Sequence, residues 1–181
     1  MEVMQTDLPG VVILIPQVFT DHRGWFFESC SRRTLAAHGI DFNIAQINRS
    51  CSLQRYTLRG LHFQNHPYAQ AKIIRCTAGS ILDAAVDLRR DSPAYLQYTM
   101  VELSAANRRQ LYIPRGFAHG CLTLTDNTEI EYLTDEFYYP EADRTLRFDD
   151  PAIGISWETA DPILSAKDAA APFLRDCGCN F

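Results

Sequence analysis

Short apolar runs separated by turn-rich pieces recur along this chain and leave little room for helices. The strand-like runs are Val11–Ile15, Lys72–Thr77, Ile81–Asp87, Tyr98–Leu103, Gln110–Ile113, Gly120–Leu124, Thr128–Thr134 and Ile153–Trp157. Strands at this spacing are typical of an antiparallel sandwich or barrel. We therefore predict an all-β fold with one helix that Ser31 caps and Gly39 ends, and a second short helix near Ala166–Leu174.

The size and charge of the chain narrow the class of protein. Its 181 residues, 46% of them apolar, fit one globular domain with a sizeable core. The net charge of −5 comes without a basic block, so a nucleic acid polymer is not an expected partner. No apolar run reaches the length of a spanning helix and the first ten residues do not resemble a secretion signal, so we expect no membrane partner and a cytoplasmic protein. The six cysteines, Cys177 and Cys179 among them, show no zinc-knuckle spacing and are expected to be free thiols.

Two runs, Leu58–Gln64 and Pro114–Gly120, each place one histidine inside a largely apolar stretch. In the first run, Arg59 precedes His62 by three residues, and an arginine beside a buried imidazole indicates an anionic ligand at the mouth of a pocket. The alternative is that His62 and His119 are hydrogen-bonded core histidines. Only a pocket with matched partners distinguishes a site from such a core.

Spacing along the strands predicts which side chains share a face. If the strands around Phe63–Ala71 form a hairpin, His62 and Lys72 lie opposite each other on one face, because their separation is even. The same argument places His119 and Tyr132 together around a turn at Thr125–Asn127, provided that the loop has an even length.

Two carboxylates, Asp83 and Asp87, fall on one face of a predicted strand. Carboxylates on an inward face are costly unless cations or donors pair with them. For Asp83 the candidate partners are Lys72, His119 and Arg59. Asp87 is expected instead to end its strand and cap a turn with Arg89.

Several motifs occur in the order of a known family. They are Gln46–Ser50, Leu58–Gln64, Lys72, Asp83, Asp87–Arg89, Ile113–Gly120, Tyr132, Tyr138, Pro140, Asp150–Pro151 and Ser165–Asp168. In these the chain resembles the dTDP-4-dehydrorhamnose 3,5-epimerase family, nucleotide-sugar epimerases of the cupin superfamily, from Gly10 to about Phe173. The resemblance implies a cupin-like jelly roll with a few short helices, as one domain over residues 1–181. It also implies a homodimer that exchanges N-terminal segments, with a peripheral tail at residues 174–181.

The resemblance further implies roles for individual residues. His62 would be the general base that takes a proton beside the sugar ketone, and Asp168 would pair with it. Tyr132 would deliver a proton to the opposite face, and Lys72 would stabilise the charge on the C4 oxygen. The implied substrate-binding residues are Arg59 at the diphosphate, Gln46 and Asn48 at the sugar or phosphate, His119 near Lys72, Tyr138 near the ligand, and Asp83. Arg23 and Glu28 would reach the nucleotide from the partner subunit.

The implied chemistry suits these residue types. A proton beside a ketone becomes removable when fixed cationic donors stabilise the developing enolate. Inversion needs a base on one face and an acid on the other, which imidazole and phenol can provide. No cofactor is expected, and no metal, because Gly60–Gln64 lacks the second histidine of metal-binding cupins and His66 lies four residues beyond His62.

Some alternatives stay open at the level of the sequence. Leu133, Cys121 and Tyr56 depart from the family pattern, which leaves open a dTDP or CDP nucleotide and inversion at C3, C5 or both. A 3,4-ketoisomerase would also remove a proton beside the ketone but would move the carbonyl. A sugar-binding jelly roll without catalysis is the third hypothesis.

Overall fold

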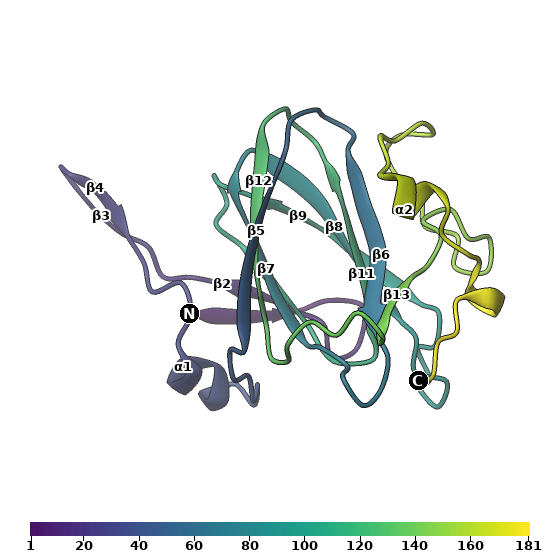
Figure 1. The fold of residues 1–181 in the computed structure, drawn as a ribbon. Coiled ribbons are helices and arrows are strands. Elements are labelled where there is room, and N and C mark those ends of the chain that lie inside the picture. Colours follow the sequence, from purple (N-terminus) through teal and green to yellow (C-terminus); the bar gives the residue numbers. More distant parts are fainter.

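The computed structural model describes residues 1–181, which form two antiparallel sheets packed face to face (Figure 1). The six-stranded sheet runs, edge to edge, through β1 (Glu2–Gln5), β2 (Val12–Ile15), β10 (Gln110–Ile113), β7 (Lys72–Ala78), β12 (Thr128–Thr134) and β5 (Gln46–Ser52). The five-stranded sheet runs through β13 (Asp143–Thr145), β6 (Leu58–Gln64), β11 (Phe117–Thr123), β8 (Ser80–Asp87) and β9 (Tyr98–Ser104). The predicted all-β jelly roll is confirmed.

The two predicted hairpins are wrong. Strands β6 and β7 belong to different sheets, and so do β11 and β12. Consecutive strands of a jelly roll often cross from one sheet to the other, so alternation within one sheet does not relate their side chains. His62 pairs instead with His119 on β11 and with Thr145 on β13. His62 and Lys72 therefore lie on different sheets and face each other across the sandwich, and so do His119 and Tyr132.

Most predicted strands have nearly the predicted bounds, with two exceptions. Strand β11 begins at Phe117, three residues before the predicted start at Gly120. Ile153–Trp157 is not a strand, because its chain turns back at once: the amides of Ile153 and Gly154 both donate to the carbonyl of Asp150, and Gly154 has a φ of +69°.

The helices are short and capped as the sequence predicts. Helix α1 (Arg32–Ala37) starts at the N-cap Ser31, whose side chain accepts from the Thr34 amide, and Gly39 follows it with a φ of +77°. The second predicted helix is divided into α2 (Ala166–Ala169), capped by Ser165, and a 3₁₀ turn (Leu174–Asp176). None of the helices is long and apolar enough to cross a membrane.

Three apolar clusters hold the sheets together. The largest fills the space between them and includes Ile74, Leu103 and Leu111. A second lies outside the six-stranded sheet, where Leu35 of α1 packs, and a third lies outside the five-stranded sheet under the C-terminal segment. The outer faces of β7 near Ile73 and of β8 near Val86 are therefore covered, whereas the edge strand β5 alternates exposed and half-buried residues.

Two peripheral segments differ in how they contact this sandwich. The hairpin of β3 (Phe19–Asp21) and β4 (Gly24–Phe26) projects from the body, with Trp25 58% exposed and Phe26 68% exposed (Figure 1). The C-terminal tail instead packs on the loop between β6 and β7. Asn65 donates to the Gly178 carbonyl at 2.7 Å, and the Asn180 amide group donates to the His66 carbonyl at 3.2 Å. The Phe181 ring lies against the rings of Phe63 and His66.

Candidate functional site

A cavity of about 680 Å³ collects polar side chains from both sheets and from α2. Of the predicted site residues, those that line it are His62, Tyr132, Asp168, Lys72, Arg59, His119, Gln46, Asn48 and Tyr138. Asp83 lies behind His119, to which it is hydrogen-bonded, while Arg23 and Glu28 lie on or beside the projecting hairpin and do not line the cavity of this chain.

His62 and Asp168 form a hydrogen-bonded pair at the edge of the cavity. The Nε2 atom of His62 lies 2.7 Å from Oδ1 of Asp168, whose side chain is buried while the imidazole is 32% exposed. An ionised carboxylate only accepts, so Nε2 donates and Nδ1 keeps its lone pair free for a proton. The His62 ring thus has the tautomer and the access that a general base needs.

Asp168 is fixed by the start of α2. The Ser165 hydroxyl donates to Oδ2 of Asp168 at 2.8 Å and accepts from the Asp168 amide at 3.1 Å. Burial acts to raise the pKa of Asp168, but the hydrogen bonds from His62 and Ser165 outweigh it and lower that pKa. Asp168 therefore stays charged behind His62. Ser165 was not predicted as a functional residue, although its spacing to Asp168 resembles a capping box.

A bulge in β6 brings Arg59 to the same cavity as His62. Three residues separate them, which in a regular strand would place them on opposite faces. His62 pairs with His119 and Arg59 with Cys121, so β6 has one residue more than β11 between these two pairs. Gly60 lies in the bulge with a φ of +123°, and a Cβ there would lie 2.6 Å from the Gly120 Cα. Only glycine fits this position.

A second imidazole–carboxylate pair lies deeper. The Nε2 atom of His119 is 2.7 Å from Oδ1 of Asp83, and the side chains are 11% and 0% exposed. This is one of the partners that the sequence offered for Asp83. Asp87 takes the other predicted role, because its carboxylate accepts from the Arg89 guanidinium at 2.7 Å and from Ser92 at 2.6 Å.

Lys72 and Tyr132 face these pairs from the six-stranded sheet. On neighbouring strands, Lys72 pairs with Thr134 and Tyr132 with Ile74, so both side chains point to one face. Burial lowers the pKa of Lys72 to about 8 and raises the pKa of Tyr132. Lys72 forms no ion pair within the protein, and a buried ammonium without a bound partner is typical of a functional group.

The remaining predicted residues surround the opening of the cavity. Gln46 donates to Asn48 at 2.6 Å and accepts from the backbone amide of Tyr138 at 3.2 Å. The Arg59 guanidinium donates to Ser52 and to the Cys51 carbonyl, both at 3.0 Å, and these bonds hold its positive charge at the cavity.

Asp143 and Lys167 also line the cavity, and sequence reasoning did not single them out as site residues. The Lys167 ammonium donates to Oδ2 of Asp143 at 2.5 Å, and the Tyr138 hydroxyl donates to the same oxygen at 3.3 Å. Lys167 stands in the Ser165–Asp168 motif, which offered a signal. Asp143 follows a turn and offered none. No three acidic, histidine or cysteine side chains cluster as the ligands of a metal ion would.

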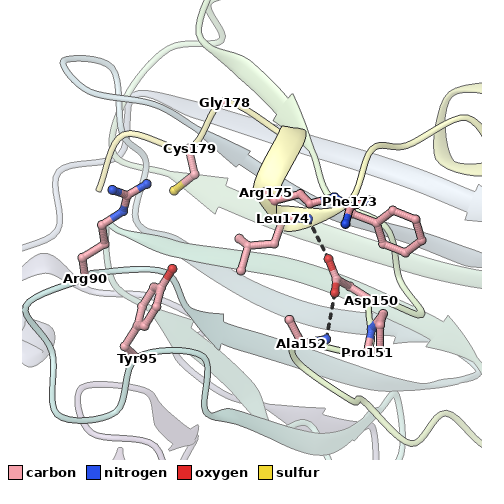
Figure 2. Close-up of a pocket in the computed structure, with 10 residues that line it drawn as sticks. All are labelled: Arg90, Tyr95, Asp150, Pro151, Ala152, Phe173, Leu174, Arg175, Gly178 and Cys179. Atoms are coloured by element: carbon pink, nitrogen blue, oxygen red, sulfur yellow. Dashed lines mark hydrogen bonds between the residues drawn. The ribbon is translucent and has the colours of Figure 1, made fainter.

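A second cavity, of about 640 Å³, lies under the C-terminal tail (Figure 2). Its Asp150 accepts from the amides of Leu174 at 2.6 Å and Ala152 at 2.8 Å, as the dashed lines show. Arg90 and Tyr95, from the loop after β8, line the same cavity. The Asp150 carboxylate is thus bound to backbone amides, and no histidine lines this second cavity.

Comparison with known proteins identifies the family of this chain. The family model of dTDP-4-dehydrorhamnose 3,5-epimerase matches residues 5–176. The chain is 47% identical over 176 residues to such an epimerase from Salmonella typhimurium, covering 96% of both chains. A crystal structure of the Bacillus anthracis epimerase with TDP and PPi bound has a TM-score of 0.93 and 42% identity, covering 96% of this chain and 99% of that one.

A further relative of known structure was solved with a sugar nucleotide. It is the dTDP-6-deoxy-D-glucose-3,5-epimerase of Legionella pneumophila in complex with dTDP-4-keto-L-rhamnose, with a TM-score of 0.91 and 37% identity over 96% of this chain and 93% of that one. Sequence, fold and comparisons converge, and the chain belongs to the dTDP-4-dehydrorhamnose 3,5-epimerase family.

Proposed function

We propose that this protein inverts C5 and C3 of dTDP-4-keto-6-deoxyglucose by moving protons beside the C4 ketone. One observation carries the proposal: a carboxylate-bound imidazole on one sheet and a phenol on the other line a single cavity, with a buried ammonium beside them. The names of the relatives, which are 3,5-epimerases over nearly the full chain, support this substrate class.

His62 is the proposed base. Its Nδ1 takes the proton from the carbon next to the ketone, and the C–H electron pair moves into an enolate. The resulting imidazolium donates through Nε2 to the charged Asp168, which stabilises it. The exposed edge of His62 gives the substrate access to Nδ1.

Lys72 is the proposed partner of the enolate. Its ammonium is already desolvated, so it needs little reorganisation when negative charge develops on the C4 oxygen. Near neutral pH it is protonated, because its pKa is about 8. The negative charge of the enolate then gives this buried cation the direct ion-pair partner that it lacks within the protein.

Tyr132 is the proposed acid. It lies on β12, in the sheet opposite His62, and so reaches the other face of a sugar held between them. Burial raises the pKa of Tyr132 and keeps the phenol protonated until the carbanion forms. Delivery of its proton to that face inverts the centre. Solvent then returns a proton to the phenolate and removes one from the imidazolium.

Heavy water tests the proposal directly. Incubation of the protein with dTDP-4-keto-6-deoxyglucose in D₂O should place deuterium at C5 and C3 of an inverted product, read by NMR and mass spectrometry. His62→Asn should bind substrate and incorporate none. A 3-keto product would identify a ketoisomerase, and deuterium at only one centre would identify a monoepimerase. Activity with the CDP-linked sugar alone would show that the substrate carries CDP instead of dTDP. Silence with both substrates, despite binding, would leave a sugar-binding protein.

We also propose a homodimer in which each β3–β4 hairpin lies on the partner subunit. The exposed Trp25 and Phe26 would gain from burial, and the hairpin carries Arg23, which in this chain pairs only with Asp21. Glu28, which follows the hairpin, accepts from Thr34 at 2.9 Å. Sedimentation should give a dimer, and Trp25→Asp together with Phe26→Asp should give monomers with weakened nucleotide binding. The six free thiols suit a cytoplasmic enzyme, which cell fractionation can test.

A further inference from the structure

The chain contains only two lysines, Lys72 and Lys167, and both line the same cavity. The other fifteen of its seventeen basic residues are arginines, counted from the sequence. Lysine differs from arginine in that burial and neighbouring charges readily shift its protonation. Both side chains with this property thus lie where the proposed chemistry takes place.

Asp143 lines the cavity together with both lysines and forms an ion pair with one of them, Lys167. It lies on β13, two residues from Thr145, which pairs with His62, and its carboxylate lines the cavity with a side chain 17% exposed. Oδ2 of Asp143 accepts from Lys167 at 2.5 Å and from the Tyr138 hydroxyl at 3.3 Å. The Asp143 carboxylate is therefore held in place from two sides. Of the two lysines, Lys167 is the more exposed, with 53% of its side chain accessible, whereas Lys72 is buried.

We propose that Asp143 is a positioning residue that keeps the Lys72 ammonium protonated, and that Lys167 weakens this effect because it binds the same carboxylate oxygen. Asp143 reaches the reaction through Lys72, not through contact with the reacting atoms. The consequence for catalysis rests on the proposed function, in which Lys72 stabilises the enolate. The charge relation among the three side chains does not.

The surroundings of Lys72 support opposite effects for the two partners. Burial is the largest influence on Lys72 and lowers its pKa to about 8, the charge of Asp143 is the largest that opposes it, and Lys167 adds to the lowering. The titratable and charged side chains that line the cavity with it are Asp143 on β13, His119 and Cys121 on β11, Arg59 and His62 on β6, Arg49 on β5, Tyr132 on β12, Tyr138 after β12, and Lys167 and Asp168 on α2, with Asp83 on β8 hydrogen-bonded to His119.

The balance matters because a neutral amine cannot stabilise an enolate by charge. With a pKa of about 8, Lys72 begins to lose its proton just above neutral pH. Without the charge of Asp143, that loss would begin at lower pH, and the proposed enolate would lose its cation there.

The two lysines make a direct measurement possible. Protein labelled with lysine enriched in ¹³C at the ε carbon should give two side-chain NMR signals, and Lys167→Arg should remove one, which assigns the other to Lys72. In that variant the Lys72 midpoint should equal the wild-type midpoint, because the positive charge is retained.

Two further variants should move the Lys72 midpoint in opposite directions. Asp143→Asn should lower it by about half a pH unit or more, because the opposing charge is lost. Lys167→Gln should raise it. The matched control is Asp149→Asn, which removes a carboxylate bound to Arg147 at 2.6 Å outside the cavity and should leave the midpoint unchanged.

An unmoved midpoint in Asp143→Asn, or shifts of the same sign in both variants, would overturn the proposal, because a purely structural ion pair gives no opposite signs. If Asp143→Asn does not fold, the exposed Lys167→Gln decides alone, and a midpoint that fails to rise refutes it. In the active enzyme, the alkaline loss of kcat should begin at lower pH in Asp143→Asn and at higher pH in Lys167→Gln. Absence of epimerase activity in the wild type would refute the proposed function while the NMR shifts stand.

Discussion

The protein holds two imidazole–carboxylate pairs that look alike and differ in access. In both, Nε2 of a histidine lies 2.7 Å from an aspartate oxygen. His62 is 32% exposed and its partner Asp168 is held by Ser165, whereas His119 is 11% exposed and its partner Asp83 is completely buried. Oδ2 of Asp83 has no hydrogen-bond partner in the protein.

The difference shows that the pair itself does not make a base. Proton transfer needs a free Nδ1 that a substrate can reach, which the outer pair offers, whereas the inner pair balances charge in the wall of the cavity. A buried pair is weak evidence for stability, but removing one partner strands the other's charge. The outer pair should therefore govern turnover, and the inner pair should govern folding.

Exchange of each histidine for asparagine should separate the two pairs most strongly. His62→Asn should reduce kcat by about a thousandfold, because the base is lost, and change stability by less than about 1 kcal/mol. His119→Asn should cost about 3 kcal/mol of stability, since it strands the buried Asp83, and reduce kcat far less. Steady-state kinetics and urea unfolding at pH 7 measure both. Equal losses of kcat would contradict the division of roles.

Lys72→Met tests the group that faces both pairs. We expect kcat to fall by about a hundredfold or more, because the enolate loses its cation. Stability should rise on the order of 2 kcal/mol at pH 7, because methionine removes a buried charge.

The sign of that gain follows from the two protonation equilibria of Lys72. Its folded pKa, about 8, lies below the unfolded value of 10.5, so the wild type gains stability as the pH rises between them. The advantage of Lys72→Met is complete below pH 8 and vanishes toward pH 10.5. A variant less stable than the wild type at pH 7 would show that the carboxylates around Lys72 outweigh the cost of burying its charge.

The smallest effect is expected at Ser165. Ser165→Ala removes a helix cap and a hydrogen bond to Asp168, so the pKa of Asp168 should rise and activity should be lost at higher pH on acidification. The matched control is Ser31→Ala, which removes the corresponding cap of α1 far from the cavity. Both should cost about 1 kcal/mol, and only Ser165→Ala should move the acid limb of kcat. If Ser31→Ala moves the acid limb of kcat as far as Ser165→Ala does, Ser165 has no specific role in holding Asp168.

Sequence alone predicted the fold class, most strands and the cap of α1, because these depend on local periodicity and on single turn residues such as Ser31 and Gly39. The sequence-based prediction failed where the chain crosses from one sheet to the other. Local alternation could not show that β6 and β7 lie in different sheets, since only the packing of the whole sandwich decides that.

In the site, too, residues with a local motif could be predicted, whereas contacts that depend on distant parts of the chain could not. Arg59, His62 and Lys72 were named from their motifs, but the bulge that puts Arg59 beside His62 depends on the close approach of Gly60 to Gly120. Asp143 carries no motif and enters the cavity only because β13 pairs with β6. Residues without a local pattern could not be found from the sequence.

The scarcity of lysine has a practical consequence for anyone handling the protein. Amine-reactive dyes, biotin esters and resin coupling have only Lys72, Lys167 and the N-terminal amine to modify, and the two lysines lie at the proposed catalytic centre. Labelling should attach first at the exposed Lys167, whereas the buried Lys72 becomes reactive only as it loses its proton at alkaline pH. Attachment through the exposed Cys51 offers a different handle, though it lies beside Arg59.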